Sequence, residues 1–362
     1  MSPPIRRLLT LGIVIGLAIG IWTQRSLLVA SVQHVPQLGL VAGLLIVGLI
    51  VGERLARAWM MRHAVGQLTH AEGFVVHDVG AAASYGLPAG GANGAGLRYQ
   101  IVRTAGVRTE PFLAGVTVFG IAMAASSWLL PALFLVIELA TGRGTAVDGL
   151  LLGLTLLVPA VAGLTWWSLL CSDRVFGRVT AIASWGATRA GRRIRVIRGF
   201  DVSERLASLR TQTRTSISRL PALLIGAVAA QVLAAAILFV ALRALTPETR
   251  LDVVEFGQVF FLTRVVSSLA PTPGGVGAVE TGLTASLVML GVDAPAALAS
   301  VVVYRLATFV VPIATGLLCW MVWHRRSVAA PDSAEEATVE PVTGLPSTAT
   351  VLPSGSAVVR SR

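Results

Sequence analysis

Glu280 and Arg305 are the residues whose type and position most directly suggest chemistry. Arg305 lies about ten residues into the apolar run 296–323, or roughly 15 Å along a helix. An isolated arginine at the centre of a bilayer costs at least ~2.5–3.5 kcal/mol, so it requires protein, water or an acidic partner. We predict that Glu280 is this partner. The pair is either a structural ion pair or part of a site for an anionic headgroup or for proton coupling.

Glu280 follows a stretch that cannot continue as a helix. Residues 268–280 read Ser-Leu-Ala-Pro-Thr-Pro-Gly-Gly-Val-Gly-Ala-Val-Glu. Proline removes a backbone donor, and glycine weakens a helix by roughly 1 kcal/mol relative to alanine. In lipid, a broken backbone is tolerated only where it is buried in protein or lines a wet cavity. We therefore predict a broken helical hairpin, whose turn contains Pro271, Pro273, Gly274, Gly275 and Gly277.

A second stretch of this kind covers residues 74–107, which are too polar and too rich in glycine to span a bilayer. Its Pro88-x-x-Gly91-x-x-Gly94 pattern matches Pro271-x-x-Gly274-x-x-Gly277, and a Gly-Val pair follows each pattern. No strand pattern precedes these glycines, so a dinucleotide-binding loop is not expected. We predict a second hairpin with its turn at Pro88, Gly91 and Gly94.

Arginines accompany both hairpins. Arg98 follows Gly94 by four residues, and Arg264 precedes the second turn. The guanidinium group binds phosphate in a bidentate manner, and helix N-termini that point toward the centre also favour anions. The predicted substrate-binding residues are Arg98, Arg264, Glu280 and Arg305.

The composition is that of a membrane protein. Of 362 residues, 54% are hydrophobic and 13% are charged, against about 25% charged in soluble domains. The 29 basic residues are all arginine. The lack of lysine excludes a Walker A ATPase, a Schiff-base enzyme and a Ser-x-x-Lys nucleophile. The two cysteines and five histidines form no metal-binding motif, so no metal or cofactor is expected.

The charge distribution predicts the topology. The Arg-dense connection 173–219 is expected to be cytoplasmic, with part of it on the membrane surface. The net charge of +11 lies beside apolar spans, which indicates contact with anionic lipids and not with nucleic acid. The expected six full spans are residues 8–23, 37–58, 111–137, 149–172, 220–242 and 296–323.

With both termini in the cytoplasm, these spans place the two hairpins in opposite orientations. The expected fold class is an all-α multi-pass membrane protein with two re-entrant broken hairpins in an inverted-topology repeat. Its halves are residues 1–140 and 149–326, and residues 327–362 are predicted to form a disordered cytoplasmic tail. Such repeats place their substrate sites near the midplane, at discontinuous helices.

The sequence resembles the membrane region of lysylphosphatidylglycerol synthase, a flippase-like integral membrane family, over roughly residues 5–325. The resemblance is carried by Ala-Pro-Thr-Pro-Gly-Gly-Val-Gly-Ala-Val-Glu at 270–280, Gly291-Val292, Ala297-Leu298, Tyr304-Arg305, Pro312 and Gly316, and more loosely by Leu87-Pro88 through Arg98. It implies a bacterial plasma-membrane protein that moves or modifies lipids. The synthase carries a large soluble aminoacyl-transfer domain, whereas only a short tail follows Arg326, so transfer from tRNA is not expected.

Three functional hypotheses follow. The first is translocation of an anionic phospholipid or a polyprenyl-linked glycolipid between leaflets. The second is a non-catalytic partner of a separately encoded lipid-modifying synthase or glycosyltransferase. The third is an intramembrane lipid transferase, which requires a clustered acid/base or metal constellation. His77, Asp78 and Glu280 are too scattered in the sequence to provide one, so we do not expect an enzyme.

Overall fold

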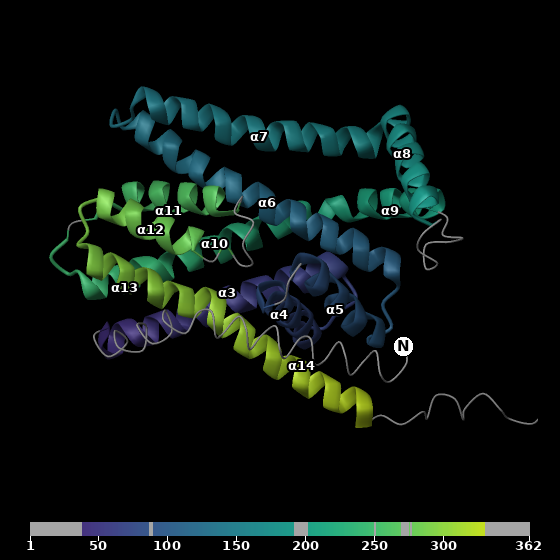
Figure 1. Cartoon of the computed structure of the whole chain (residues 1–362), viewed down its shortest axis with the longest axis horizontal. Coiled ribbons are helices and arrows are strands. Elements are labelled where there is room, and N and C mark those ends of the chain that lie inside the picture. Colours follow the sequence, from purple (N-terminus) through teal and green to yellow (C-terminus); the bar gives the residue numbers. More distant parts are fainter. Residues whose placement is uncertain are drawn as a thin grey trace, which may run out of the picture. The chain divides into compact units, whose positions relative to one another are not determined.

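A computed structural model of the chain describes residues 38–86, 90–191, 202–249, 251–268, 275 and 277–329 (Figure 1). Within these ranges the regular structure is helical and contains no strand. The helices are α3 (Gly39–Val65), α4 (His70–Gly86), α5 (Gly90–Thr104), α6 (Thr109–Ala140), α7 (Ala146–Cys171), α8 (Asp173–Gly191), α9 (Val202–Ser216), η3 (Ile217–Arg219), α10 (Leu220–Leu245), α11 (Val253–Ser268), α12 (Ala278–Met289), α13 (Ala294–Arg305), η5 (Leu306–Val310) and α14 (Val311–Ala329). The chain divides into a compact unit that ends at Trp323 and a second unit, His324–Arg362.

Five helical stretches are long and apolar enough to cross a membrane. They are Gly39–Val65, Thr109–Ala140, Ala146–Cys171, Leu206–Leu245 and Ala294–Arg325. They correspond to five of the six expected spans, and the expected span at 8–23 lies outside the described residues. The fold is therefore all-helical, with several candidate membrane spans.

The surface of α7 supports a lipid environment. Leu150 is 75% exposed, Leu157 is 59% exposed and Leu164 is 66% exposed, although all three lie on one long apolar helix. A soluble monomer rarely leaves so continuous an apolar surface in water. These side chains require an apolar medium around the helix.

The core is built around α10, which packs against α3, α6 and α13. Leu238 and Leu242 of α10 are fully buried. Gly226 lets α10 approach α3 closely, since a Cβ atom there would lie 2.6 Å from Cγ of Met60. α10 and α3 are thus held together by apolar packing that a larger residue at position 226 would disturb.

The first predicted hairpin forms a pair of packed helices, α4 and α5. The sequence predicted Gly91 and Gly94 in the turn of this hairpin. However, α5 already begins at Gly90, so both residues lie in the first turns of the helix. Gly94 serves close packing instead, because a Cβ atom there would lie 2.6 Å from the carbonyl oxygen of Gly80. Pro88 lies outside the described residues.

The second predicted hairpin is the packed pair α11 and α12. Gly275 and Gly277 precede α12 with φ angles of +67° and +84°, a conformation that side chains other than glycine rarely adopt. Both residues therefore have a backbone conformation that favours glycine, directly before the start of α12. Pro271, Pro273 and Gly274 lie outside the described residues.

The two helix pairs are joined to the rest of the fold at opposite ends of α10. Arg219, just before α10, donates to the carbonyl oxygens of His63 and Ala64 at 3.2 and 3.1 Å, close to where α4 begins. α11 instead follows the C-terminal end of α10. There Arg143 Nη1 lies 2.6 Å from Asp252 Oδ2 and joins the α6–α7 loop to the α10–α11 loop.

The Arg-dense connection contains α8 and α9, and residues 192–201 between them lie outside the described part. α8 crosses the ends of α7 and α9, which it contacts (Figure 1). Arg210 of α9 donates to the carbonyl oxygen of Leu170 at 2.9 Å and to Asp173 Oδ1 at 2.7 Å. Arg210 therefore links α9 to the junction of α7 and α8.

Candidate functional site

The interior contains two clusters of charged side chains. One is centred on Glu280 at the start of α12, and the other on Asp78 in α4. Glu280 is 6% exposed and Asp78 is fully buried. A buried charge is costly unless it is paired and hydrogen-bonded, so the partners of these two carboxylates define the candidate site.

Glu280 pairs with Arg305, as the sequence predicted. Arg305 Nε donates to Glu280 Oε1 at 2.6 Å, and the backbone N–H of Gly277 donates to Glu280 Oε2 at 2.7 Å. One carboxylate thereby caps α12 and neutralises an arginine at the end of α13. The pair fixes the end of the second hairpin turn against α13.

Arg305 also connects the second helix pair with the first. Its guanidinium group lies 4.7 Å from the ring centroid of Phe309, and the Phe309 ring lies 5.4 Å from the ring of Tyr85 in α4. Phe309 further packs beside Leu97 of α5 in one small apolar cluster. The stretch that follows Arg305 therefore contacts α4 and belongs to a cluster against which α5 also packs.

This stretch is π-helical. α13 ends at Arg305, the π-helical segment η5 covers Leu306–Val310, and α14 continues from Val311. π-helical turns are rare, and they are frequent at functional sites. Here the irregular turn lies between Arg305 and the residues of α14 that reach the second polar cluster.

Arg264 of α11 lies close to this region. Its guanidinium donates to the hydroxyl group of Tyr304, which is fully buried and adjacent in sequence to Arg305. The same guanidinium lies 5.8 Å from the ring centroid of Phe260. Arg264 thus contacts neutral aromatic side chains and, among its described contacts, no carboxylate.

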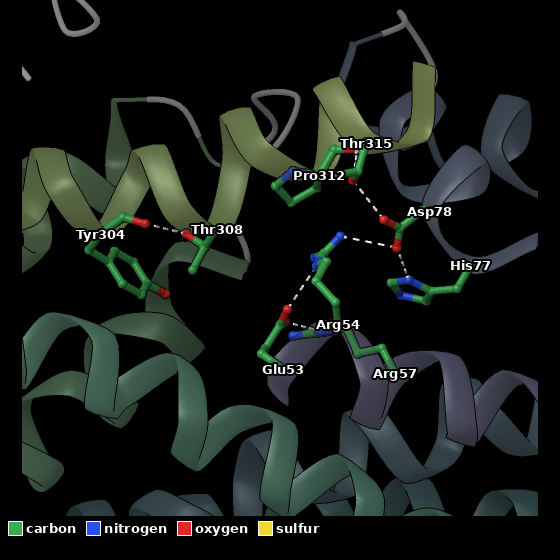
Figure 2. A network of polar contacts seen from close by, with 9 residues as sticks. All are labelled: Glu53, Arg54, Arg57, His77, Asp78, Tyr304, Thr308, Pro312 and Thr315. Atoms are coloured by element: carbon green, nitrogen blue, oxygen red, sulfur yellow. Dashed lines mark hydrogen bonds and ion pairs between the residues drawn. The ribbon is translucent and has the colours of Figure 1, made fainter. Parts of the chain in front are cut away.

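Asp78 joins three helices (Figure 2). Its Oδ1 accepts from Arg54 Nη1 of α3 at 3.2 Å and lies 2.9 Å from His77 Nδ1. Its Oδ2 accepts from the hydroxyl of Thr315 in α14 at 2.7 Å. Asp78 therefore holds α3, α4 and α14 together through hydrogen bonds.

Glu53 completes this second cluster. It accepts from Arg54 Nε at 3.0 Å and from Arg57 Nε, one helical turn further along α3 (Figure 2). In the sequence, Arg54 and Arg57 stand at the end of the expected span 37–58, where positive charge is typical of a cytoplasmic boundary. The spacing of Glu53 and Arg57, four residues apart on a helix, was a signal for an internal ion pair.

Arg98 of α5 lies against Gly80 of α4, next to the second cluster. A Cβ atom at position 80 would overlap Arg98 Nε and would lie 2.6 Å from Arg98 Cδ. Arg98 Nε is buried and has no hydrogen-bond partner in the described part of the chain. Of the four predicted binding residues, Glu280 and Arg305 bind each other and Arg264 bonds to the neighbour of Arg305. No described contact links Arg98 with any of these three.

The described residues contain no group of three or more His, Cys, Asp or Glu side chains that would hold a metal ion. His77 and Asp78 do come together, but their further partners are Arg54 and Thr315. The arrangement can bind, orient and neutralise charges. It resembles an ion-pair network more than an acid/base constellation.

Long apolar helices with ion pairs in their interior define an all-helical, multi-pass membrane protein. Residues 9–316 match the family described as the lysylphosphatidylglycerol synthase TM region, and the chain belongs to this family. The match confirms the resemblance carried by the residues around Glu280 and Arg305. It indicates a membrane protein connected with lipid metabolism or transport. Comparisons with curated proteins and with solved structures gave no match.

Proposed function

We propose that this protein moves a lipid with an anionic headgroup between the leaflets of the bacterial plasma membrane, with both of its termini in the cytoplasm. The lipid is an anionic phospholipid or a polyprenyl-linked glycolipid. The family supports a role with lipids, and the positions of the two helix pairs support movement across the bilayer. Such movement requires a polar path for the headgroup through an apolar medium.

The proposed path lies between two re-entrant hairpins, α4–α5 and α11–α12, within six full spans and an inverted repeat. Support comes from their connections to opposite ends of α10, close to Arg219 and Asp252. Further support comes from the stretch after Arg305, which contacts the first pair through Phe309 and Tyr85. In transporters of this architecture, substrate sites lie near the midplane, between such broken elements.

The observation that carries the proposal is an excess of positive charge in and beside the two clusters. The two clusters and their neighbours contain the guanidinium groups of Arg54, Arg57, Arg98, Arg264 and Arg305 and the carboxylates of Glu53, Asp78 and Glu280. Among the described residues, five guanidinium groups therefore face three carboxylates, which leaves two positive charges unbalanced. An anionic headgroup would supply the missing charge, with Arg98, Arg264, Glu280 and Arg305 as the proposed binding residues.

A reconstitution experiment tests translocation directly. The purified protein is placed in vesicles that contain fluorescent phosphatidylglycerol, and the fraction of label accessible to a membrane-impermeant quencher is followed over time. We expect faster exchange than in protein-free vesicles, and a loss of most of this gain in Glu280→Gln and Arg305→Ala. Arg108→Ala serves as a control, because the Arg108 side chain is 82% exposed in a loop.

Absence of lipid movement in vesicles, together with normal behaviour of cells that carry Glu280→Gln or Arg305→Ala, would reject translocation. The protein would then fit the alternative of a membrane partner for a separate lipid-modifying enzyme. Co-purification with such an enzyme that is unaffected by Glu280→Gln and Arg305→Ala would support the partner function over translocation.

A further inference from the structure

Arg98 differs from the other arginines of the second cluster in having no described acidic partner. Arg54 and Arg57 share Glu53, and Arg54 also contacts Asp78. Arg98 Nε is buried without any hydrogen bond, while the residue as a whole is only partly buried. Arg98 is therefore a partly exposed residue for which no ion pair is described.

The nearby carboxylates are already occupied. Both oxygens of Asp78 accept hydrogen bonds, from Arg54 and Thr315, and both oxygens of Glu53 accept from arginines. The charge of Arg57 also acts on Arg98, which adds repulsion to the positive charge there. A buried charge without compensation is unfavourable, so this position favours the arrival of an anion.

The absence of a side chain at Gly80 leaves the space that the Arg98 side chain occupies. The side chain crosses α4 where Gly80 has only a hydrogen atom, and even a methyl group would collide with Arg98 Nε, Cγ and Cδ. Gly94 brings the backbones of α4 and α5 together at the same level, because a Cβ atom there would lie 2.6 Å from the carbonyl oxygen of Gly80. The two glycines thus position a guanidinium group that forms no ion pair with any described residue.

We propose that Arg98, positioned by Gly80, binds a phosphate group, either the phosphodiester of a lipid headgroup or free inorganic phosphate. The planar guanidinium group presents paired N–H donors that match two phosphate oxygens. This inference rests on the proposed function when the phosphate belongs to a lipid. It assigns anion binding to Arg98, while Arg305 remains engaged with Glu280.

The test measures binding to the purified full-length protein in detergent, with dihexanoyl-phosphatidylglycerol and with inorganic phosphate as separate ligands. Arg98→Gln removes the charge, and Gly80→Ala keeps the charge but displaces the side chain. We expect both substitutions to raise Kd at least about tenfold, the effect of losing one charge-assisted hydrogen bond. Gly96→Ala is the matched control on α5, because a Cβ atom at position 96 meets nothing within 4 Å.

A thermal melt accompanies each binding measurement. Without ligand, Arg98→Gln should melt at the same temperature as the wild type or higher, because it removes an uncompensated buried charge. With ligand, its melting temperature should no longer rise. A purely structural arginine would give the opposite result, a lower melting temperature without ligand and an unchanged rise with it. This comparison decides the question even if Gly80→Ala fails to fold.

Weaker binding of the lipid alone assigns the site to a headgroup, and weaker binding of inorganic phosphate alone assigns it to the free anion. Unchanged Kd values for both ligands in Arg98→Gln would overturn the proposal. Ligand binding that depends on Arg98 in a protein that moves no lipid would reject translocation but keep this site. Lipid movement together with unchanged ligand binding in Arg98→Gln would reject the Arg98 site but keep translocation.

Discussion

Glu280 uses both oxygens of its carboxylate, one for the guanidinium group of Arg305 and one for the backbone N–H of Gly277. The turn before α12 and the end of α13 are therefore held by the same side chain. Gly277 has a positive φ angle, so the turn requires glycine as well as this hydrogen bond.

Glu280→Gln should destabilise the protein by about 3 kcal/mol, because it removes the carboxylate that pairs with the buried guanidinium group of Arg305. The glutamine oxygen can still accept from Gly277, so the loss reports mainly on the ion pair. The measurement is denaturant unfolding in detergent of Glu280→Gln, Arg305→Gln and the double variant. We expect the double variant to lose less free energy of unfolding than the two single variants lose together, by at least about 1 kcal/mol. Strictly additive effects would contradict a direct pair.

Asp78→Asn should be more damaging than the loss of any one of its hydrogen bonds. It leaves Arg54 and Arg57 with only the Glu53 carboxylate, and we expect a loss of roughly 3–5 kcal/mol. Thr315→Val is the matched variant, since it removes one hydrogen bond to the same carboxylate and should cost only about 1–2 kcal/mol. Unfolding midpoints compare the two, and equal losses would show that charge is not the main contribution of Asp78.

Gly316→Ala should separate α14 from α4. A Cβ atom at position 316 would overlap the carbonyl oxygen of Asp78 and would lie 2.6 Å from Cβ of Ala82. Overpacking of this kind costs about 1–3 kcal/mol. Gly153→Ala in α7 is the control, because a Cβ atom there meets nothing within 4 Å. Thermal melts of the two variants provide the measurement, and we expect Gly153→Ala to be neutral or stabilising. Equal destabilisation by Gly316→Ala and Gly153→Ala would contradict close packing at position 316.

The Arg143–Asp252 contact should make stability depend on pH at the α6–α7 and α10–α11 loops. The hydrogen bond from Arg143 holds the pKa of Asp252 below its usual value. The stabilisation is therefore fully present above the unfolded pKa of about 3.9 and is lost as the pH falls through the folded pKa. Arg143→Gln should melt below the wild type at pH 6, and the difference should shrink toward pH 3. A difference that stays constant over this range would exclude the contact as its source.

Much of the fold follows from apolar run length and from turn residues. The run around Leu150 predicted α7, and the glycines at 275 and 277, which have positive φ angles, lie directly before α12. The Glu280–Arg305 pair was also predictable, because a lone arginine in an apolar helix requires a nearby carboxylate. These features depend on local sequence and on one strong energetic constraint.

The Asp78 cluster was not predicted, for a physical reason. Arg54 and Arg57 lie near the end of an apolar run, where positive charge is typical of a cytoplasmic boundary. Only the packing of α14 against α4 brings Thr315 to Asp78, across more than two hundred residues of sequence. The role of a glycine was equally hard to predict, because glycine serves both turns and close helix packing. Gly94 serves helix packing, although the neighbouring residues suggested a turn.

The π-helical segment after Arg305 also sets the angular register of everything that follows it. A π turn holds about one residue more than an α turn, and one residue rotates a helix face by about 100°. Arg305 and Thr315 can therefore face different helices, α12 and α4, although α13, η5 and α14 form one continuous helical segment. Removing one residue within 306–310 would restore a regular helix and leave Arg305 in place, but it would turn Thr315 and Gly316 away from Asp78.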